Sequence, residues 1–118
     1  MQVALQVRRR FDRSLLECAG YLVPGHDPAV LLVHEPDIFP RVPPRVALTL
    51  AGHTHGGQVR IPFYGPLVVP SRYGERFAYG HIVEGGRHLI VSGGLGMTGV
   101  PIRFGVPPEI VLVTVREA

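Results

Sequence analysis

Three histidines stand just beyond predicted strands, and they are the side chains best suited to chemistry in this sequence. The apolar run 29–33 ends at His34, and the apolar run 46–51 is followed shortly by His53 and His55. Ligand sites in sheet proteins gather at strand ends. In an extended segment, residues two apart point the same way, so His53 and His55 could bind one metal ion or two adjacent ones. Imidazole nitrogen is a good ligand for zinc, iron, nickel and copper.

Glycines surround the second and third of these histidines. Gly52, Gly56 and Gly57 allow the backbone to bend sharply and a ligand to approach closely. A His-x-His spacing alone is a weak signal in a chain with 6 histidines, but its placement between glycines after a buried strand strengthens it. The alternative is a pair of loop histidines that bond to backbone carbonyls.

Two acidic residues next to His34 could support its ring. Glu35 and Asp37 could each orient the imidazole. Capping the turn after Pro36 is the better role for Asp37, because aspartate is a preferred helix N-cap.

The remaining reactive side chains give structural predictions instead. His26 is expected in a solvated loop, and His81 and His88 are expected to face outward from a hairpin. Cys18 is the single cysteine, which excludes an intrachain disulfide and favours a buried thiol. Arg103 is predicted either to meet an anion or to lie on the surface. No serine, threonine or tyrosine has the partners of a catalytic nucleophile.

The composition limits the elements that can position these residues. The 118 residues are 46% hydrophobic and 18% charged, which excludes disorder as the main state. The 15 glycines and 12 prolines exclude long helices. The net charge of +3 does not by itself indicate nucleic-acid binding, although the run Arg8–Arg10 could contact phosphate or a membrane surface. No apolar stretch is long enough to span a membrane, and the start lacks the apolar core of a signal peptide.

The expected elements are therefore mostly short strands. The runs 29–33 and 46–51 predict strands that are buried on both faces. The segments 77–83 and 87–92 predict a hairpin with a three-residue loop. The other expected elements are a strand over 1–7, a short helix over 12–19, one helical turn near Asp37, a strand over 59–61 and a last strand over 110–115.

The histidines lie within longer motifs that carry a resemblance to a known family. His34-Glu35-Pro36-Asp37 is followed by Gly52-His53-Thr54-His55-Gly56-Gly57-Gln58, and further likeness runs through 65–66, 71–74, 91–96 and 101–110. On these residues the chain resembles the calcineurin-like metallophosphoesterases, particularly their bacterial membrane-associated branch. The likeness covers roughly residues 29 to 115.

The resemblance implies an α/β fold of β-rich character. The expected architecture is half of a two-sheet αβ sandwich of the metallo-dependent phosphatase type, with long Gly/Pro loops and one or two short helices. Residues 1–28 match poorly and are expected to form a strand plus a short helix. Residues 29–118 correspond to the C-terminal half of the phosphoesterase domain.

The resemblance also implies a dinuclear site of divalent metal ions, Mn, Fe or Zn. Two ions in such sites clamp a phosphate ester and generate a hydroxide for in-line attack. His34 and His53 would bind one ion and His55 the other. Gly52, Thr54 and Arg103 are the candidate substrate contacts, with Thr54 also serving as a spacer.

Several family motifs are missing from the chain. It has no Asp-x-His and no Gly-Asp pair, and without any asparagine it cannot contain the Gly-Asn-His segment. Gly93 also stands where many relatives have arginine. None of the family's catalytic residues is therefore expected here. The chain is expected to be a truncated domain that is inactive alone, and Met1 need not be the natural start.

The expected partners follow from the same resemblance. They are a lipid- or nucleotide-linked phosphate ester, a membrane surface for the full-length protein, and a second copy that pairs through exposed sheet edges. The expected location is the cytoplasm or the membrane periphery, and nucleic acid is not expected. The alternative function is a non-catalytic, metal-binding or dimerising β-rich fragment. A cupin-like barrel fits the sequence poorly.

Overall fold

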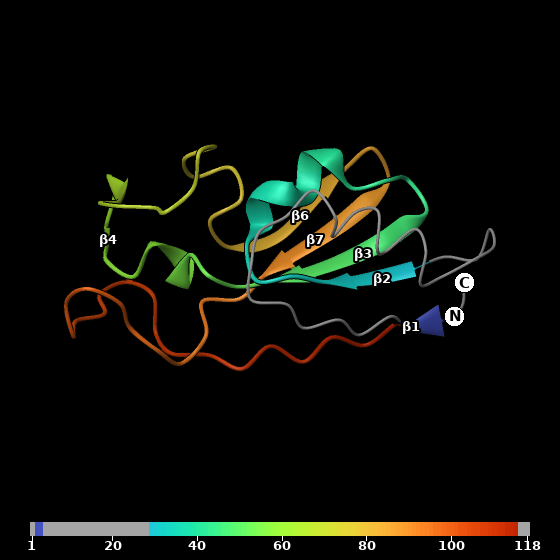
Figure 1. Ribbon diagram of the computed structural model, residues 1–118. Coiled ribbons are helices and arrows are strands. Elements are labelled where there is room, and N and C mark those ends of the chain that lie inside the picture. The colour runs from blue at the N-terminus through green and yellow to red at the C-terminus, as the bar shows by residue number, and fades with distance from the viewer. Residues whose placement is uncertain (1, 4–28, 116–118) are drawn as a thin grey trace.

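The fold centres on one mixed sheet. The structure is a computed structural model that describes residues 2–3 and 29–115 (Figure 1). Five strands form the sheet in the order β1-β2-β3-β7-β6. Their bounds are Gln2–Val3 for β1, Ala29–Leu32 for β2, Val46–Ala51 for β3, Gly80–Glu84 for β6 and Arg87–Val91 for β7.

The apolar runs form strands of this sheet, as predicted, but the expected burial on both faces is wrong, because only Ala29 of β2 and Val46 and Thr49 of β3 are buried. Strands β1, β2, β3 and β7 pair in parallel, and β6 adds an antiparallel edge. Leu31, Thr49 and Leu89 lie side by side on one face, and Val30, Leu48 and His88 lie side by side on the other. The predicted hairpin of the later strands is antiparallel, and its second strand, β7, also pairs in parallel with β3.

The hairpin β6–β7 is tighter than predicted. Glu84 pairs with Arg87, so the loop has two residues, Gly85 and Gly86, instead of three. Their φ angles are +56° and +73°, which glycine adopts without steric cost and which a two-residue turn of type I′ needs. Strand β6 also begins later than expected, because Phe77 lies in a turn and is fully buried in the core.

A short helix covers one face of the sheet. The 3₁₀ helix η1, Pro36–Arg41, confirms the helical turn expected near Asp37 (Figure 1). Phe39 of η1 meets Phe77 edge to face, with ring centroids 5.7 Å apart, and Arg87 lies 5.0 Å from the Phe39 ring centre. The buried apolar cluster comprises Ala29, Ile38, Phe39, Val42, Val46, Phe77, Leu89 and Val91.

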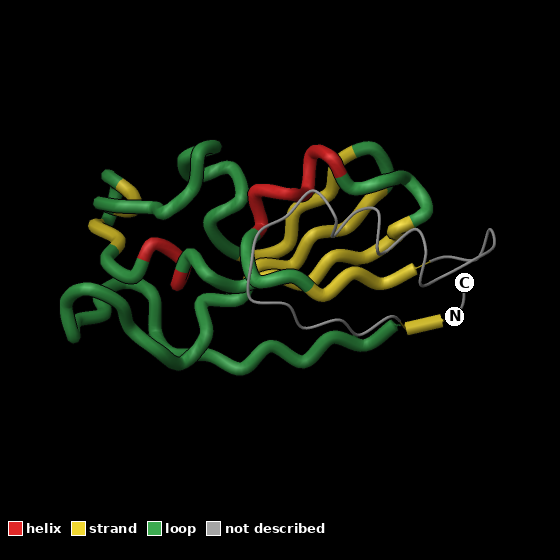
Figure 2. Tube along the Cα trace, in the orientation of Figure 1, coloured by secondary structure: helices red, strands yellow, loops and turns green. Residues whose placement is uncertain are grey.

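Long loops extend from the carboxyl ends of the parallel strands (Figure 2). They contain the 3₁₀ turn η2, His55–Gly57, and the two-residue strands β4, Arg60–Ile61, and β5, Gly65–Pro66. Strand β4 confirms the strand expected over 59–61 in part.

The predicted last strand does not form. Residues 110–115 are irregular, and among residues 2–3 and 29–115 they have no ladder partner. Figure 1 shows this segment running alongside the sheet instead of joining its edge. Leu112 is 90% exposed, so the apolar run alone was a misleading signal.

The overall composition of elements confirms a β-rich α/β fragment with long loops and short helices. The helix expected over 12–19, the run Arg8–Arg10, Cys18 and His26 lie outside the described residues, as does most of the strand expected over 1–7. Within the described ranges, no helix is both long and apolar enough to cross a membrane. The division at residue 28 stays a prediction.

Candidate functional site

The parallel pairing of β2 with β3 brings His34 and His53 together. The two strands run the same way, so their carboxyl ends meet at one edge of the sheet. Hydrogen bonding continues past the strand ends, from Val33 N to Leu50 O at 3.0 Å and from Gly52 N to His34 O at 3.1 Å. These bonds hold His34 and the segment that carries His53 next to each other.

The rings of His34 and His53 are in direct contact. His34 Nε2 lies 3.1 Å from His53 Nδ1, and the ring centroids are 4.8 Å apart at an interplanar angle of 62°. One nitrogen must donate and the other accept if the pair shares a proton. His34 is exposed and His53 is half-buried, so the pair is open to solvent.

His55 does not join them, and the expectation that His53 and His55 point the same way is wrong. The segment is not extended, because Thr54 has helical angles, φ −72° and ψ −14°, between histidines with φ +69° and +52°. His55 instead places Nδ1 3.1 Å from Gly96 O. Over the part of the chain that the structure describes, no three His, Cys, Asp or Glu side chains converge as a metal site.

Of the three predicted substrate contacts, Thr54 uses its hydroxyl for hydrogen bonds within the protein. Its buried hydroxyl donates to Ala78 O at 2.6 Å and accepts from Gly56 N at 3.4 Å. Thr54 therefore fastens the histidine loop to the segment before β6. Gly52, in contrast, leaves open space, because a Cβ there would have no neighbour within 4 Å.

Arg103 binds backbone carbonyls. Its guanidinium donates to Gly93 O and Gly96 O, both at 2.6 Å, and to Val106 O at 3.2 Å. It thus holds the loop 93–96, which also carries the carbonyl that His55 contacts. The role of Arg103 toward substrate stays a prediction.

Gln58 has a structural role that was not predicted from the sequence. Its side-chain oxygen accepts from Thr98 N at 2.8 Å, and its amide donates to Thr98 O at 3.1 Å and Val100 O at 2.9 Å. Gln58 is buried, and its side chain joins the histidine loop to the segment 98–100. A polar side chain with both donor and acceptor, directly after two glycines, was the signal available in the sequence.

Asp37 has a different role from the one predicted. The 3₁₀ helix η1 has no side-chain cap at its N-terminus, so the predicted capping role is wrong. The buried carboxylate instead accepts from Ser71 Oγ at 2.5 Å and from Arg72 N at 2.8 Å. It joins η1 to the loop before β6.

An apolar groove of about 430 Å³ adjoins the histidine loop. Leu67 and Val68 line one part of it, and Val59 and Val100 line another. Thr54 and Gln58 contribute the polar part of its lining.

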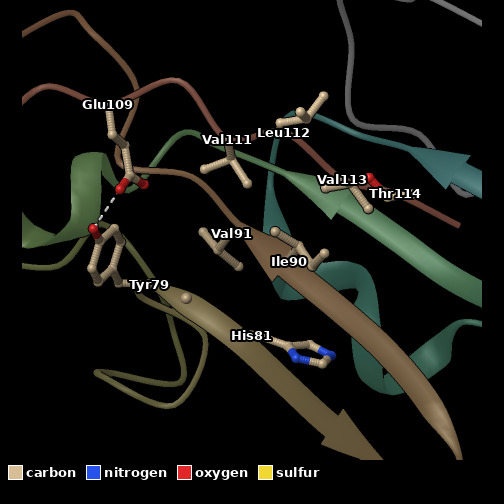
Figure 3. A pocket seen from close by; sticks show the side chains of 10 residues that line it. Tyr79, His81, Ile90, Val91, Glu109, Val111, Leu112, Val113 and Thr114 are labelled. Atoms are coloured by element: carbon tan, nitrogen blue, oxygen red, sulfur yellow. Dashed lines mark hydrogen bonds between the residues drawn. The ribbon is translucent and has the colours of Figure 1, made fainter.

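Glu109 and Tyr79 form a hydrogen-bonded network with Gly93, and Figure 3 shows the bond between the first two side chains. Tyr79 OH donates to Glu109 Oε2 at 2.6 Å, and Gly93 N donates to Glu109 Oε1 at 2.9 Å. The Tyr79 hydroxyl, and next the Gly93 N–H, lower the pKa of Glu109 from its ordinary value of 4.5. The same hydrogen bond raises the pKa of Tyr79.

We expect this network to make stability depend on acid pH. A carboxylate whose folded-state pKa is depressed stabilises the fold above its unfolded pKa, and this contribution is lost as pH falls through the folded pKa. The midpoint temperature of unfolding should therefore decrease as the pH is lowered below 4.5. In Glu109→Gln this decrease should be smaller. Melts of both proteins at about pH 6 and about pH 3 test this. An unchanged pH dependence in the variant would exclude a contribution from Glu109.

Comparison with known proteins identifies the family. Over 90 residues the chain is 46% identical to YkuE of Bacillus subtilis, named as an uncharacterized metallophosphoesterase; the match covers 75% of this chain and 31% of YkuE. This chain is related to the metallophosphoesterases. A metallophosphoesterase of Aquifex aeolicus is 34% identical over 87 residues, and this match covers 74% of this chain and 32% of the relative. Phosphodiesterase YaeI of Escherichia coli is 34% identical over 88 residues, and this match covers 73% of this chain and 32% of YaeI.

These matches show that the chain corresponds to part of a metallophosphoesterase. It spans less than a third of the length of the curated relatives named above. No family model and no solved structure matches it. The names of these relatives imply divalent metal ions and a phosphoester substrate for those proteins.

Proposed function

We propose that this chain forms part of a divalent-metal-dependent phosphoester hydrolase. His34 and His53 bind one metal ion, and His55 binds a second. The observation that carries the proposal is the 3.1 Å distance between His34 Nε2 and His53 Nδ1 at the carboxyl ends of two parallel strands. The relationship to metallophosphoesterases supports it independently.

The donor atoms of His34 and His53 suit a shared ion. Imidazole–metal bonds are about 2.0–2.1 Å long, so two nitrogens about 3 Å apart can both reach one ion. Both rings are neutral ligands, and oxygen ligands from water or from outside the described residues complete the coordination. Bound divalent ions in such sites polarise a phosphoryl oxygen and activate water for attack on phosphorus.

The Gly96 carbonyl prepares His55 to act as a ligand. A carbonyl oxygen can only accept, so the contact of 3.1 Å requires a proton on His55 Nδ1. The lone pair of the neutral ring then lies on Nε2, which is free to bind metal. Arg103 fixes Gly96 from the other side through the same carbonyl oxygen.

A phosphodiester is the proposed substrate class. The Escherichia coli relative is named a phosphodiesterase, which supports this choice. The apolar lining of the groove beside Thr54 suits a substrate that carries an apolar group next to its phosphate. No carboxylate joins the histidines among the described residues, and we propose that the 118-residue chain is inactive alone.

A hydrolysis assay tests the proposal. It compares the chain with a chimera in which the chain replaces the matched segment of YkuE, using Mn²⁺ and a bis-aryl phosphate diester. We expect turnover by the chimera only, and we expect His53→Ala to lower kcat by at least about 100-fold because it removes a metal ligand. Phe63→Ala, a change at an exposed loop residue, serves as the control and should keep full activity. Strong turnover by the chain that survives His53→Ala would exclude the proposed site.

A further inference from the structure

A second pair of histidines lies on the hairpin β6–β7, away from the site above. His81 Nε2 is 2.8 Å from His88 Nδ1, and the rings stack with centroids 5.1 Å apart and an interplanar angle of 19°. Both residues are exposed, as the sequence predicted. The two histidine pairs lie at different points along β3. His88 lies across from Leu48, three residues before β3 ends at Ala51, whereas His53 comes after that end.

The register of the hairpin holds the two rings together. Val83 lies directly across from His88, and Ile90 lies directly across from His81. His81 and His88 are therefore diagonal neighbours on one face, a separation that long side chains bridge. The two-residue turn at Gly85 and Gly86 fixes this register. Figure 3 shows the His81 ring lying beside β7, near Ile90.

We propose that His81 and His88 form a metal site selective for Ni²⁺ or Cu²⁺. Two imidazole nitrogens 2.8 Å apart, each about 2.05 Å from one ion, subtend an angle of about 86° at that ion. This angle matches adjacent positions in square-planar or octahedral geometry, which Cu²⁺ and Ni²⁺ prefer. Tetrahedral coordination by the same ligands needs a nitrogen separation of about 3.3 Å. The pair therefore favours Ni²⁺ and Cu²⁺ over Zn²⁺.

The pair provides only two protein ligands. Within residues 2–3 and 29–115, no third His, Cys, Asp or Glu completes a metal-binding cluster. Glu84, at the end of β6, forms a bidentate pair with Arg76, with distances of 2.9 Å and 2.8 Å. Water therefore fills the other coordination positions, and the bound ion is exchangeable and open to a further ligand.

Calorimetric titration with Ni²⁺ tests the site. The parent protein is the 118-residue chain with His34→Gln and His53→Gln, so that the other histidine pair does not contribute. We expect one Ni²⁺ per chain, and we expect His81→Gln to weaken binding at least tenfold. His88→Gln should have the same effect, and Zn²⁺ should bind at least tenfold more weakly than Ni²⁺.

Phe63→Ala is the control, because it changes a fully exposed loop residue outside the hairpin β6–β7. It should bind Ni²⁺ as the parent does. If the parent does not fold, NMR of the unsubstituted chain gives the same test, because bound Ni²⁺ broadens the ring signals of nearby histidines. Comparison with His81→Gln assigns the His81 signals. The proposal is wrong if Ni²⁺ does not bind the hairpin, or if binding is unchanged in both His81→Gln and His88→Gln.

Discussion

Phe39→Ala is expected to lower the free energy of unfolding by about 3–5 kcal/mol. Phe39 is fully buried in the 3₁₀ helix η1, where it packs on Phe77 and under the guanidinium of Arg87. Truncation removes this contact area and leaves a cavity that the short helix cannot close by itself. The loss is a large fraction of the stability that a domain of this size usually has.

Phe63→Ala is the control for this measurement. Phe63 is the same residue type but is fully exposed, so its truncation should change stability by no more than about 0.5 kcal/mol. Urea unfolding followed by circular dichroism gives both values. Equal effects of the two substitutions would contradict the position of η1 over the sheet.

Gly57→Ala is expected to cost about 2–5 kcal/mol of stability. Gly57 has φ +80°, where an L side chain is strained, and a Cβ there would lie 2.5 Å from Pro66 Cβ. Both penalties act on the turn that follows His55 and precedes Gln58. We therefore expect the histidine loop to lose its conformation before the sheet unfolds.

Gly52→Ala provides the comparison within the same loop. A Cβ at Gly52 would meet nothing within 4 Å, and the residue does not have a positive φ. Its substitution should change stability by less than about 1 kcal/mol. Thermal melts of the two variants, together with amide hydrogen exchange of residues 53–58, separate the effects. Comparable melts for both variants would contradict the close packing of η2 against β5.

The sequence predicted the bounds of two strands of the sheet well. The runs 29–33 and 46–51 are continuous, apolar and bounded by prolines or glycines, and they form β2 and β3 within one residue of the expected bounds. The parallel order of these strands then accounts for the meeting of His34 and His53. The apolar runs predicted where the strands lie but not how deeply they are buried, since most of β2 and β3 is half-buried and Ala47 is exposed.

The loops could not be predicted in the same way, because tertiary hydrogen bonds set their conformations. The direction of His55 depends on the turn at Thr54, whose hydroxyl bonds to Ala78, 24 positions away. Asp37 and Gln58 likewise bond to segments more than 30 residues distant. Nothing local to these residues specifies such partners.

The apolar run 110–115 predicts a strand that does not form. Strand formation requires pairing with a sheet edge, and residues 110–115 pair with neither of the described edge strands, β1 and β6. An apolar run indicates only that a segment could pair.

Metal binding by the His34–His53 pair is the most direct test of the proposed site. Isothermal titration with Mn²⁺ and with Zn²⁺ compares the 118-residue chain with His34→Ala and with His81→Gln. We expect His34→Ala to weaken binding at least about tenfold, because one of two adjacent nitrogen ligands is lost. His81→Gln should leave the binding at this pair unchanged. Binding in His34→Ala that equals binding in the unsubstituted chain would contradict a metal site at the ends of β2 and β3.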